Sequence, residues 1–135
     1  MRSMNTFYAL GGLRIIAALL FIEHGTQKLL GFPASAHGSP ELFSLMGLAG
    51  ILEACGGLLL LVGFKTRYVA FILSGEMAVA YWTAHAPRNF FPANNGGDAA
   101  VLFCFLFLFF VFAGAGAWSL DGRSAAPREI GVPAE

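Results

Sequence analysis

Seven ionisable residues of this 135-residue sequence lie inside stretches that are otherwise apolar: Arg14, Glu23, His24, Lys28, Glu53, Glu76 and Asp98. A charge in hydrocarbon is costly unless it is paired or hydrated, so apolar segments that carry one usually need it. Carboxylates and imidazoles bind and release protons, and a neighbouring cation changes how tightly they do so. These residues therefore predict a functional site that handles charge or protons within an apolar protein.

The composition indicates a membrane protein before any motif is considered. Hydrophobic residues make up 57% of the chain and charged residues only 12%, and the mean hydropathy is +0.69. Soluble domains carry about twice that charged fraction. There are 14 phenylalanines, several of them between residues 103 and 112. The net charge of zero gives no support for nucleic-acid binding.

Four stretches are long enough to cross a hydrocarbon core of about 30 Å, which needs about 20 helical residues. They lie near residues 7–30, 40–62, 66–86 and 98–118. Ser39, Pro40 and Glu41 suit the start of the second helix, Gly63 its end, and Thr66 a cap on the third. The connections are short, so the sequence predicts an all-α fold: one domain, residues 1–135, forming an antiparallel four-helix transmembrane bundle with a short tail, 119–135.

The basic residues predict the orientation, because cytoplasmic loops retain Lys and Arg. One end of the predicted bundle carries Arg2, Lys65, Arg67, Arg123 and Arg128, and the other carries only Lys28 and Arg88. Both termini are therefore predicted to be cytoplasmic, with Trp82 and Trp118 near opposite interfaces. A cleaved signal peptide ending near residues 34–36 is the alternative. Arg14 within the apolar stretch and the polar run 23–28 before the cleavage site argue against it.

Depths counted from the predicted cytoplasmic helix ends place three of the charges in one layer. At a rise of 1.5 Å per residue, Arg14 lies about 10 Å deep, Glu53 about 13 Å and Glu76 about 15 Å. We expect Arg14 to pair with Glu53, Glu76 or both, which leaves one carboxylate in excess or protonated. The alternative role for such a pair is purely structural, because buried ion pairs can simply fix the register of helices.

A second polar layer is expected near the outer face. His24 and Lys28 are four residues apart and share a helical face. They should meet His85 and Arg88 at the end of the third helix and Asn95 and Asp98 at the start of the fourth, forming a polar pocket open to the outside. Alternatively, Lys28 and Arg88 extend their charges to the interface, and the histidines are structural.

Other features indicate packing rather than chemistry. Small residues recur on the second predicted helix at spacings of three and four, which lets another helix approach closely: Gly47, Gly50, Ala54 and Gly57. Cys55 and Cys104 differ in predicted depth by about 8–10 Å, which disfavours a disulfide. Phosphate-binding and hydrolase motifs are absent, and no metal site is predicted. A redox role would need an external carrier, most naturally a membrane quinone, or a partner subunit.

Several segments together resemble one family. They are Arg14, the run 24–31 (HGTQKLLG), the run 53–58 (EACGGL), the run 63–67 (GFKTR), His85, the run 95–98 (NGGD) and the run 114–121 (GAGAWSLD). The chain resembles the DoxX family of small membrane proteins over nearly its whole length.

The resemblance implies a four-helix integral protein of the bacterial cytoplasmic membrane. Relatives are linked to thiosulfate:quinone oxidoreductase and to membrane oxidoreductase complexes that respond to oxidative or thiol stress. The family often has Glu where this chain has Asp98, and the shorter side chain withdraws the carboxylate by about one methylene.

Three functional hypotheses follow. The leading one is a redox-linked membrane subunit that binds a quinone between its helices, in the lipid bilayer and within a homo-oligomer or a hetero-complex. In it, Glu53 and Glu76 exchange protons, Arg14 sets their proton affinity, and His24 with Asp98 connects the site to the outside. The second is a non-catalytic assembly subunit whose charges hold helix register. The third, a small-solute or proton pathway, is disfavoured because one four-helix bundle leaves little room for a lumen.

Overall fold

The computed structural model describes residues 4–34 and 41–124, and these residues are all helical or in connecting turns. The elements are α1 (Met4–Leu30), α2 (Leu45–Val62), α3 (Thr66–Ala80), the π-helical turn η1 (Tyr81–His85), α4 (Pro92–Asn95), α5 (Asp98–Ala113) and α6 (Leu120–Ser124). Within the described ranges there is no β-strand. The predicted all-α class is therefore confirmed.

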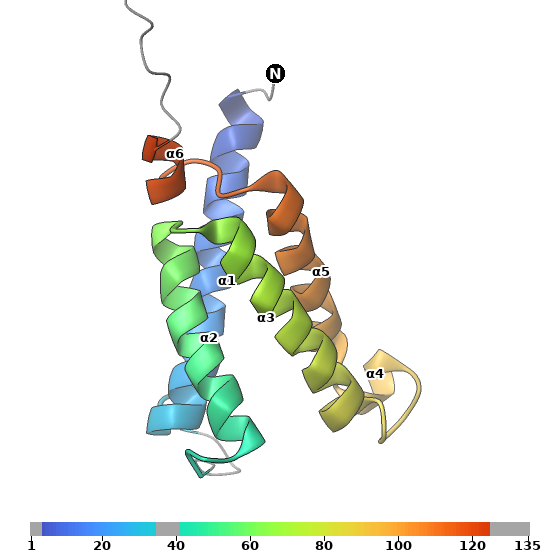
Figure 1. Ribbon diagram of the computed structural model, residues 1–135. Coiled ribbons are helices and arrows are strands. Elements are labelled where there is room, and N and C mark those ends of the chain that lie inside the picture. The colour runs from blue at the N-terminus through green and yellow to red at the C-terminus, as the bar shows by residue number, and fades with distance from the viewer. Residues whose placement is uncertain (1–3, 35–40, 125–135) are drawn as a thin grey trace, which may run out of the picture.

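The longer helices form two pairs, α1 with α2 and α3 with α5, and the chain reverses direction from each long helix to the next (Figure 1). The pairs lie close together at the end that carries α6 and diverge toward the end that carries α4. The first described residues of α1 lie at the same end as α6. The backbones of α2 and α3 therefore lie farther apart toward the α4 end than at the α6 end.

Glycines set the close packing and the register of α1 against α2. A Cβ added at Gly25 would lie 2.5 Å from the backbone nitrogen of Ala54, and one at Gly57 would lie 2.7 Å from a side-chain carbon of Ile22. Real side chains do not tolerate contacts that short, so only glycine fits at these two crossings. Of the small residues predicted to serve helix packing, Gly50, Ala54 and Gly57 do so against α1, whereas a Cβ on Gly47 would meet the backbone of Leu42 just before α2.

Aromatic side chains join the two pairs. Phe21 on α1 is fully buried, and its ring centroid lies 5.4 Å from that of Phe103 and 4.7 Å from that of Phe107 on α5. The outward faces are also apolar, with large side chains such as Phe105 and Phe112 mostly exposed. In the described residues, two helices, α1 and α2, are long and apolar enough to cross a membrane.

Two helix ends differ from the sequence-based prediction. The second helix starts at Leu45 rather than near residue 40, because the Ser44 hydroxyl accepts the backbone N–H of Gly47 at 3.0 Å and caps it there. Ser39 and Pro40, predicted to start this helix, lie outside the described residues. The last long helix ends at Ala113 rather than near residue 118.

Residues 114–118 form a loop instead of a last helical turn. Gly114, Gly116 and Trp118 all have positive φ angles, of 81°, 69° and 53°. The loop lies on α1, where the Ala117 N–H donates to the Phe7 carbonyl at 3.1 Å. A Cβ on Gly116 would lie 2.5 Å from the backbone nitrogen of Gly11, so the loop backbone needs glycine at this contact. The contact with α1 replaces the hydrogen bonds that a continued helix would have made.

The start of α3 is capped from elsewhere in the chain. Thr66, predicted as the cap, is the first helical residue, and Lys65 precedes it with φ of 47°. The Asp121 carboxylate accepts the backbone N–H groups of Lys65 and Thr66, each at 2.8 Å. Gly63 ends α2 as predicted, with φ of 66°. The short turn between α2 and α3 is therefore held by a residue of α6.

Candidate functional site

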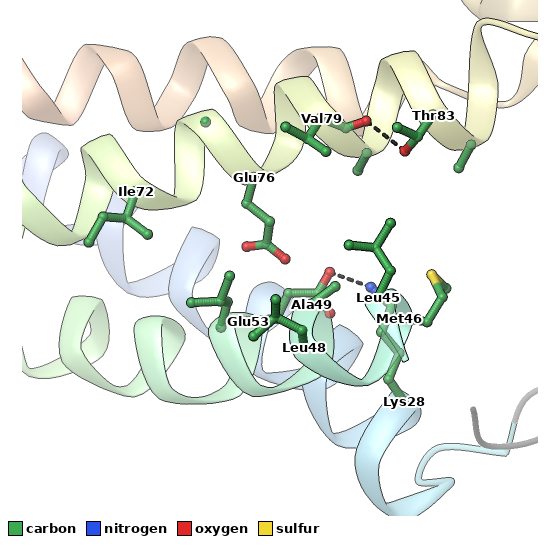
Figure 2. A pocket seen from close by; sticks show the side chains of 14 residues that line it. Lys28, Leu45, Met46, Leu48, Ala49, Glu53, Ile72, Glu76, Val79 and Thr83 are labelled. Atoms are coloured by element: carbon green, nitrogen blue, oxygen red, sulfur yellow. Dashed lines mark hydrogen bonds and ion pairs between the residues drawn. The ribbon is translucent and has the colours of Figure 1, made fainter. Parts of the chain in front are cut away.

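A pocket of about 260 Å³ opens between α2 and α3 in the half of the molecule where the helices diverge (Figure 2). Most of its lining is aliphatic. Three ionisable side chains join that lining, one from each of three helices: Lys28 from α1, Glu53 from α2 and Glu76 from α3. An apolar pocket with a few converging polar groups is the usual form of a ligand site.

Lys28 and Glu53 form an ion pair on one wall of this pocket. The Lys28 Nζ donates to Oε1 of Glu53, as the dashed line in Figure 2 marks. The Glu53 side chain is 1% exposed and that of Lys28 is 22% exposed. The second carboxylate oxygen of Glu53, Oε2, is buried and has no hydrogen-bond partner in the part of the chain that the structure describes. The pair therefore satisfies only half of the Glu53 carboxylate.

Glu76 reaches into the pocket from the opposite wall. Its carboxylate points away from α3 toward α2 and the Lys28–Glu53 pair (Figure 2). Both of its oxygens are buried, and neither has a hydrogen-bond partner in residues 4–34 and 41–124. Buried polar atoms in native proteins nearly always have a partner, and leaving one unpaired costs about 1–3 kcal/mol. The contacts of the fold therefore do not explain why a carboxylate occupies position 76.

Arg14 does not pair with either carboxylate, contrary to the prediction. The guanidinium is fully buried and donates only to backbone carbonyls. Nε donates to Ala115 at 2.8 Å, and Nη2 donates to Ala117 at 3.0 Å and Trp118 at 2.8 Å. Nη1 donates to Leu61 at 2.6 Å and also to Leu60. All five N–H groups of the guanidinium are used, so Arg14 fastens the end of α2 to the 114–118 loop.

The prediction failed because it assumed that the first two helices start and end at the same level. Helix α1 has 27 residues and α2 has 18. A Cβ on Gly63, which follows α2, would lie 3.2 Å from Cζ of Arg14, and one on Gly50 would lie 3.0 Å from Cβ of Lys28. This register sets Arg14 beside the carboxyl end of α2 and Lys28 within a turn of Glu53. Lys28, which is predicted to lie in the outer layer, instead lines the pocket and pairs with Glu53.

Only some of the other residues predicted for the outer layer lie together. His85 Nδ1 donates to the Asn95 carbonyl at 3.1 Å, so these two residues do meet. The Asn95 side chain is buried, donates to the Asn89 carbonyl at 2.8 Å and accepts the Gly97 N–H at 2.7 Å. Asn95 therefore stabilises the connection between η1 and α5, and His85 is hydrogen-bonded to its carbonyl.

His24 and Asp98 lie apart from this pocket. His24 is exposed, and its ring centroid is 6.3 Å from that of Phe103 on α5. Asp98 is exposed in the first turn of α5. The pocket lining contains neither residue, and it does not contain His85. Among residues 4–34 and 41–124, no three His, Cys, Asp or Glu side chains gather in a way that could hold a metal ion.

Asp121 is a residue whose role the sequence does not predict, because it lies in the predicted tail, 119–135. Desolvation raises the pKa of this carboxyl, but the hydrogen bonds from Thr66 and Lys65 and the charge of Arg14 outweigh it and hold the pKa below its ordinary value. A usable signal was present. The free N–H groups at a helix start attract carboxylates, and the sequence predicted Asp121 at the same end of the bundle as the start of the third helix.

The fold and the pocket define the class: a helical, membrane-associated protein with three converging ionisable groups in an apolar pocket. Comparison with known proteins supplies the family. The model of the DoxX family matches residues 9–86. A protein of Haemophilus influenzae, described only as an uncharacterized protein, is 48% identical over 125 residues, which cover 86% of this chain and 90% of the relative. No solved structure matches. The chain belongs to the DoxX family.

Proposed function

We propose that this DoxX-family protein is a multi-pass protein of the bacterial cytoplasmic membrane. In this arrangement α1, α2, α3 with η1, and α5 cross the bilayer as an antiparallel four-helix bundle with both termini in the cytoplasm. The exposed apolar side chains of these helices support it. So does the position of Lys65, Arg67 and Arg123, near the ends of helices that meet at the α6 end of the molecule.

We propose further that the protein is a membrane subunit of a quinone-linked oxidoreductase system and that the pocket between α2 and α3 binds the quinone ring. The observation that carries this is the buried, unpartnered carboxylate of Glu76 in an aliphatic pocket. Pockets for whole drug-sized ligands have volumes of about 300–1,000 Å³. A pocket of about 260 Å³ suits a single ring, with an apolar tail left outside among the lipids.

The chain's own residues have distinct roles in this proposal. The bound quinone would supply two-electron redox chemistry, and the electrons would pass to or from a partner subunit. Glu76 would give or take one of the two protons of that reaction at its carboxylate, which points into the pocket. Glu53 would accept a hydrogen bond from the same ring through Oε2, while the ion pair of Lys28 with Oε1 stabilises the charge of Glu53. Lys28 thus has the role that the sequence predicted for Arg14.

The test is to detect the ligand and then remove its predicted partner. The protein is transferred from its own membrane into lipid nanodiscs and weighed by native mass spectrometry, together with Glu76→Gln. We expect a quinone-sized mass on the wild type that is lost in the variant. Glu23→Gln is the matched control, because Glu23 is exposed on α1 and does not line the pocket.

Two outcomes would contradict the proposal. The first is a quinone-sized mass that survives in Glu76→Gln, since the carboxylate would then play no part in binding. The second is wild-type protein without a small ligand but joined stoichiometrically to an unrelated subunit in every sample. That result would identify a non-catalytic assembly subunit whose chemistry resides in its partner.

A further inference from the structure

The pocket between α2 and α3 contains three buried oxygen atoms that have no hydrogen-bond partner among the described residues: both carboxylate oxygens of Glu76 and Oε2 of Glu53. All three are acceptors, or become donors only by taking up a proton. We infer that this pocket binds the reduced, hydroxyl-bearing form of its carrier, the quinol, more tightly than the oxidised quinone. This inference rests on the proposed function and specifies which redox state of the ligand the site prefers.

The donors of the pocket are already engaged or can be satisfied elsewhere. The Thr83 hydroxyl donates to the Val79 carbonyl at 2.7 Å. Lys28 donates to Glu53, and its side chain is 22% exposed, so its other N–H groups can reach partners outside the pocket. The remaining lining residues are aliphatic or glycine. The carboxylate oxygens have no such exit, since each is buried.

Protonation of Glu76 does not reverse this imbalance. One proton converts one Glu76 oxygen into a donor but leaves its other oxygen and Glu53 Oε2 as unpartnered acceptors. A ligand that carries hydroxyl groups therefore matches the two carboxylates in either protonation state. A ligand that carries only carbonyl groups leaves at least two buried acceptors unpaired.

A quinol and its quinone are similar in size and differ in the hydrogen-bonding groups that they present. The quinol presents two O–H donors on opposite sides of the ring, and the quinone presents two carbonyl acceptors at the same positions. A carbonyl placed against a carboxylate oxygen sets two acceptors together, whereas an O–H in that place makes a charge-assisted hydrogen bond. One such bond corresponds to a preference of about tenfold or more in binding.

The experiment compares the two redox forms of one ring with the same short alkyl tail. Each is titrated anaerobically against the full-length protein in nanodiscs, with empty nanodiscs to correct for partition into lipid. We expect the quinol to bind the wild type with a Kd at least about tenfold below that of the quinone. Potentiometric titration gives an independent readout: each tenfold preference for the reduced form raises the midpoint potential of the bound pair by about 30 mV.

Variants test which atoms cause the preference. Glu76→Gln replaces one carboxylate oxygen by an amide that donates, so it should weaken binding of the quinol more than binding of the quinone. In titrations extended to high ligand concentration the ratio of the two Kd values should therefore fall toward one, whereas Glu23→Gln should keep the wild-type ratio. If Glu76→Gln does not fold, the wild-type ratio and potential still decide. A quinone that binds the wild type as tightly as the quinol overturns this inference and leaves the proposed function standing. If neither form binds, both proposals fail.

Discussion

Arg14 and Glu76 are both ionisable side chains within apolar helices, and the structure treats them in opposite ways. Arg14 is fully buried, and all five of its N–H groups donate to backbone carbonyls. Both carboxylate oxygens of Glu76 are buried, and neither has a hydrogen-bond partner. Burial of a charge therefore does not by itself identify a functional group in this protein. The number of hydrogen bonds that the buried group makes separates the structural residue from the candidate ligand-binding one.

The same contrast distinguishes the two halves of the molecule. At the α6 end, the side chains of Arg14 and Asp121 tie together three stretches that are distant in sequence: α1, residues 61–66 and residues 115–121. At the diverging end, α2 and α3 face each other across a pocket whose carboxylates are only partly satisfied. One half holds the fold together, and the other leaves a space with unmet hydrogen-bonding capacity. Three substitutions test this division.

The largest effect is expected at Arg14. Arg14→Gln removes most of the donors from five buried or half-buried carbonyls, so the free energy of unfolding should fall by about 3–5 kcal/mol. Denaturant titration in mixed micelles measures it. Arg67→Gln is the control, because this exposed arginine also donates to two carbonyls, those of Val111 and Phe112, but water can replace it. A loss at Arg14 no greater than at Arg67 would contradict the structural role.

Glu76 should respond in the opposite direction. Glu76→Met removes two unpartnered carboxylate oxygens and places a flexible apolar side chain against an aliphatic lining. The free energy of unfolding should rise by about 1–2 kcal/mol while ligand binding is lost. The same titration, with and without ligand, measures both quantities. Destabilisation without ligand would mean that the carboxylate supports the fold, and the contrast with Arg14 would disappear.

The smallest effect is expected at Asp121. Asp121→Ala removes the cap of α3 and should lower the free energy of unfolding by about 0.5–1 kcal/mol at neutral pH. The folded-state pKa of Asp121 lies below its ordinary value. Its contribution is thus complete above about pH 4 and is lost as the pH falls through the folded-state pKa. Melting temperatures of wild type and variant should therefore converge in acid. A gap independent of pH would show that the carboxylate charge is not involved.

The helices could be predicted well from the sequence, but the contacts between them could not. Each of the four apolar stretches contains a long helix, and Gly63 ends α2 where the glycine predicted it. Ser44 rather than Ser39 caps α2. The sequence did not predict this choice, because both serines precede an apolar run and local sequence does not rank them. The loop at 114–118 was missed because its glycines follow an uninterrupted apolar run and its stabilising contacts come from α1.

The candidate site shows the same limit. The sequence identified Lys28, Glu53 and Glu76 as charges within apolar segments, and all three line the pocket. The predicted pairing of Arg14 with Glu53, Glu76 or both is wrong, because the helix lengths differ and depth counted from helix ends does not measure register. Close glycine contacts between α1 and α2 fix that register, and they depend on both helices at once.

The sequence by itself determined that this protein is helical and apolar and which side chains carry charge within its helices. These properties follow from composition and from the length of uninterrupted apolar runs, which are local. Only the tertiary structure decided that Arg14 meets carbonyls, that Lys28 meets Glu53, and that Glu76 meets no partner. Those outcomes depend on the register and divergence of helices that are distant in sequence. A hydrogen bond forms only within a narrow range of distances, and no local sequence pattern determines the distance between two helices.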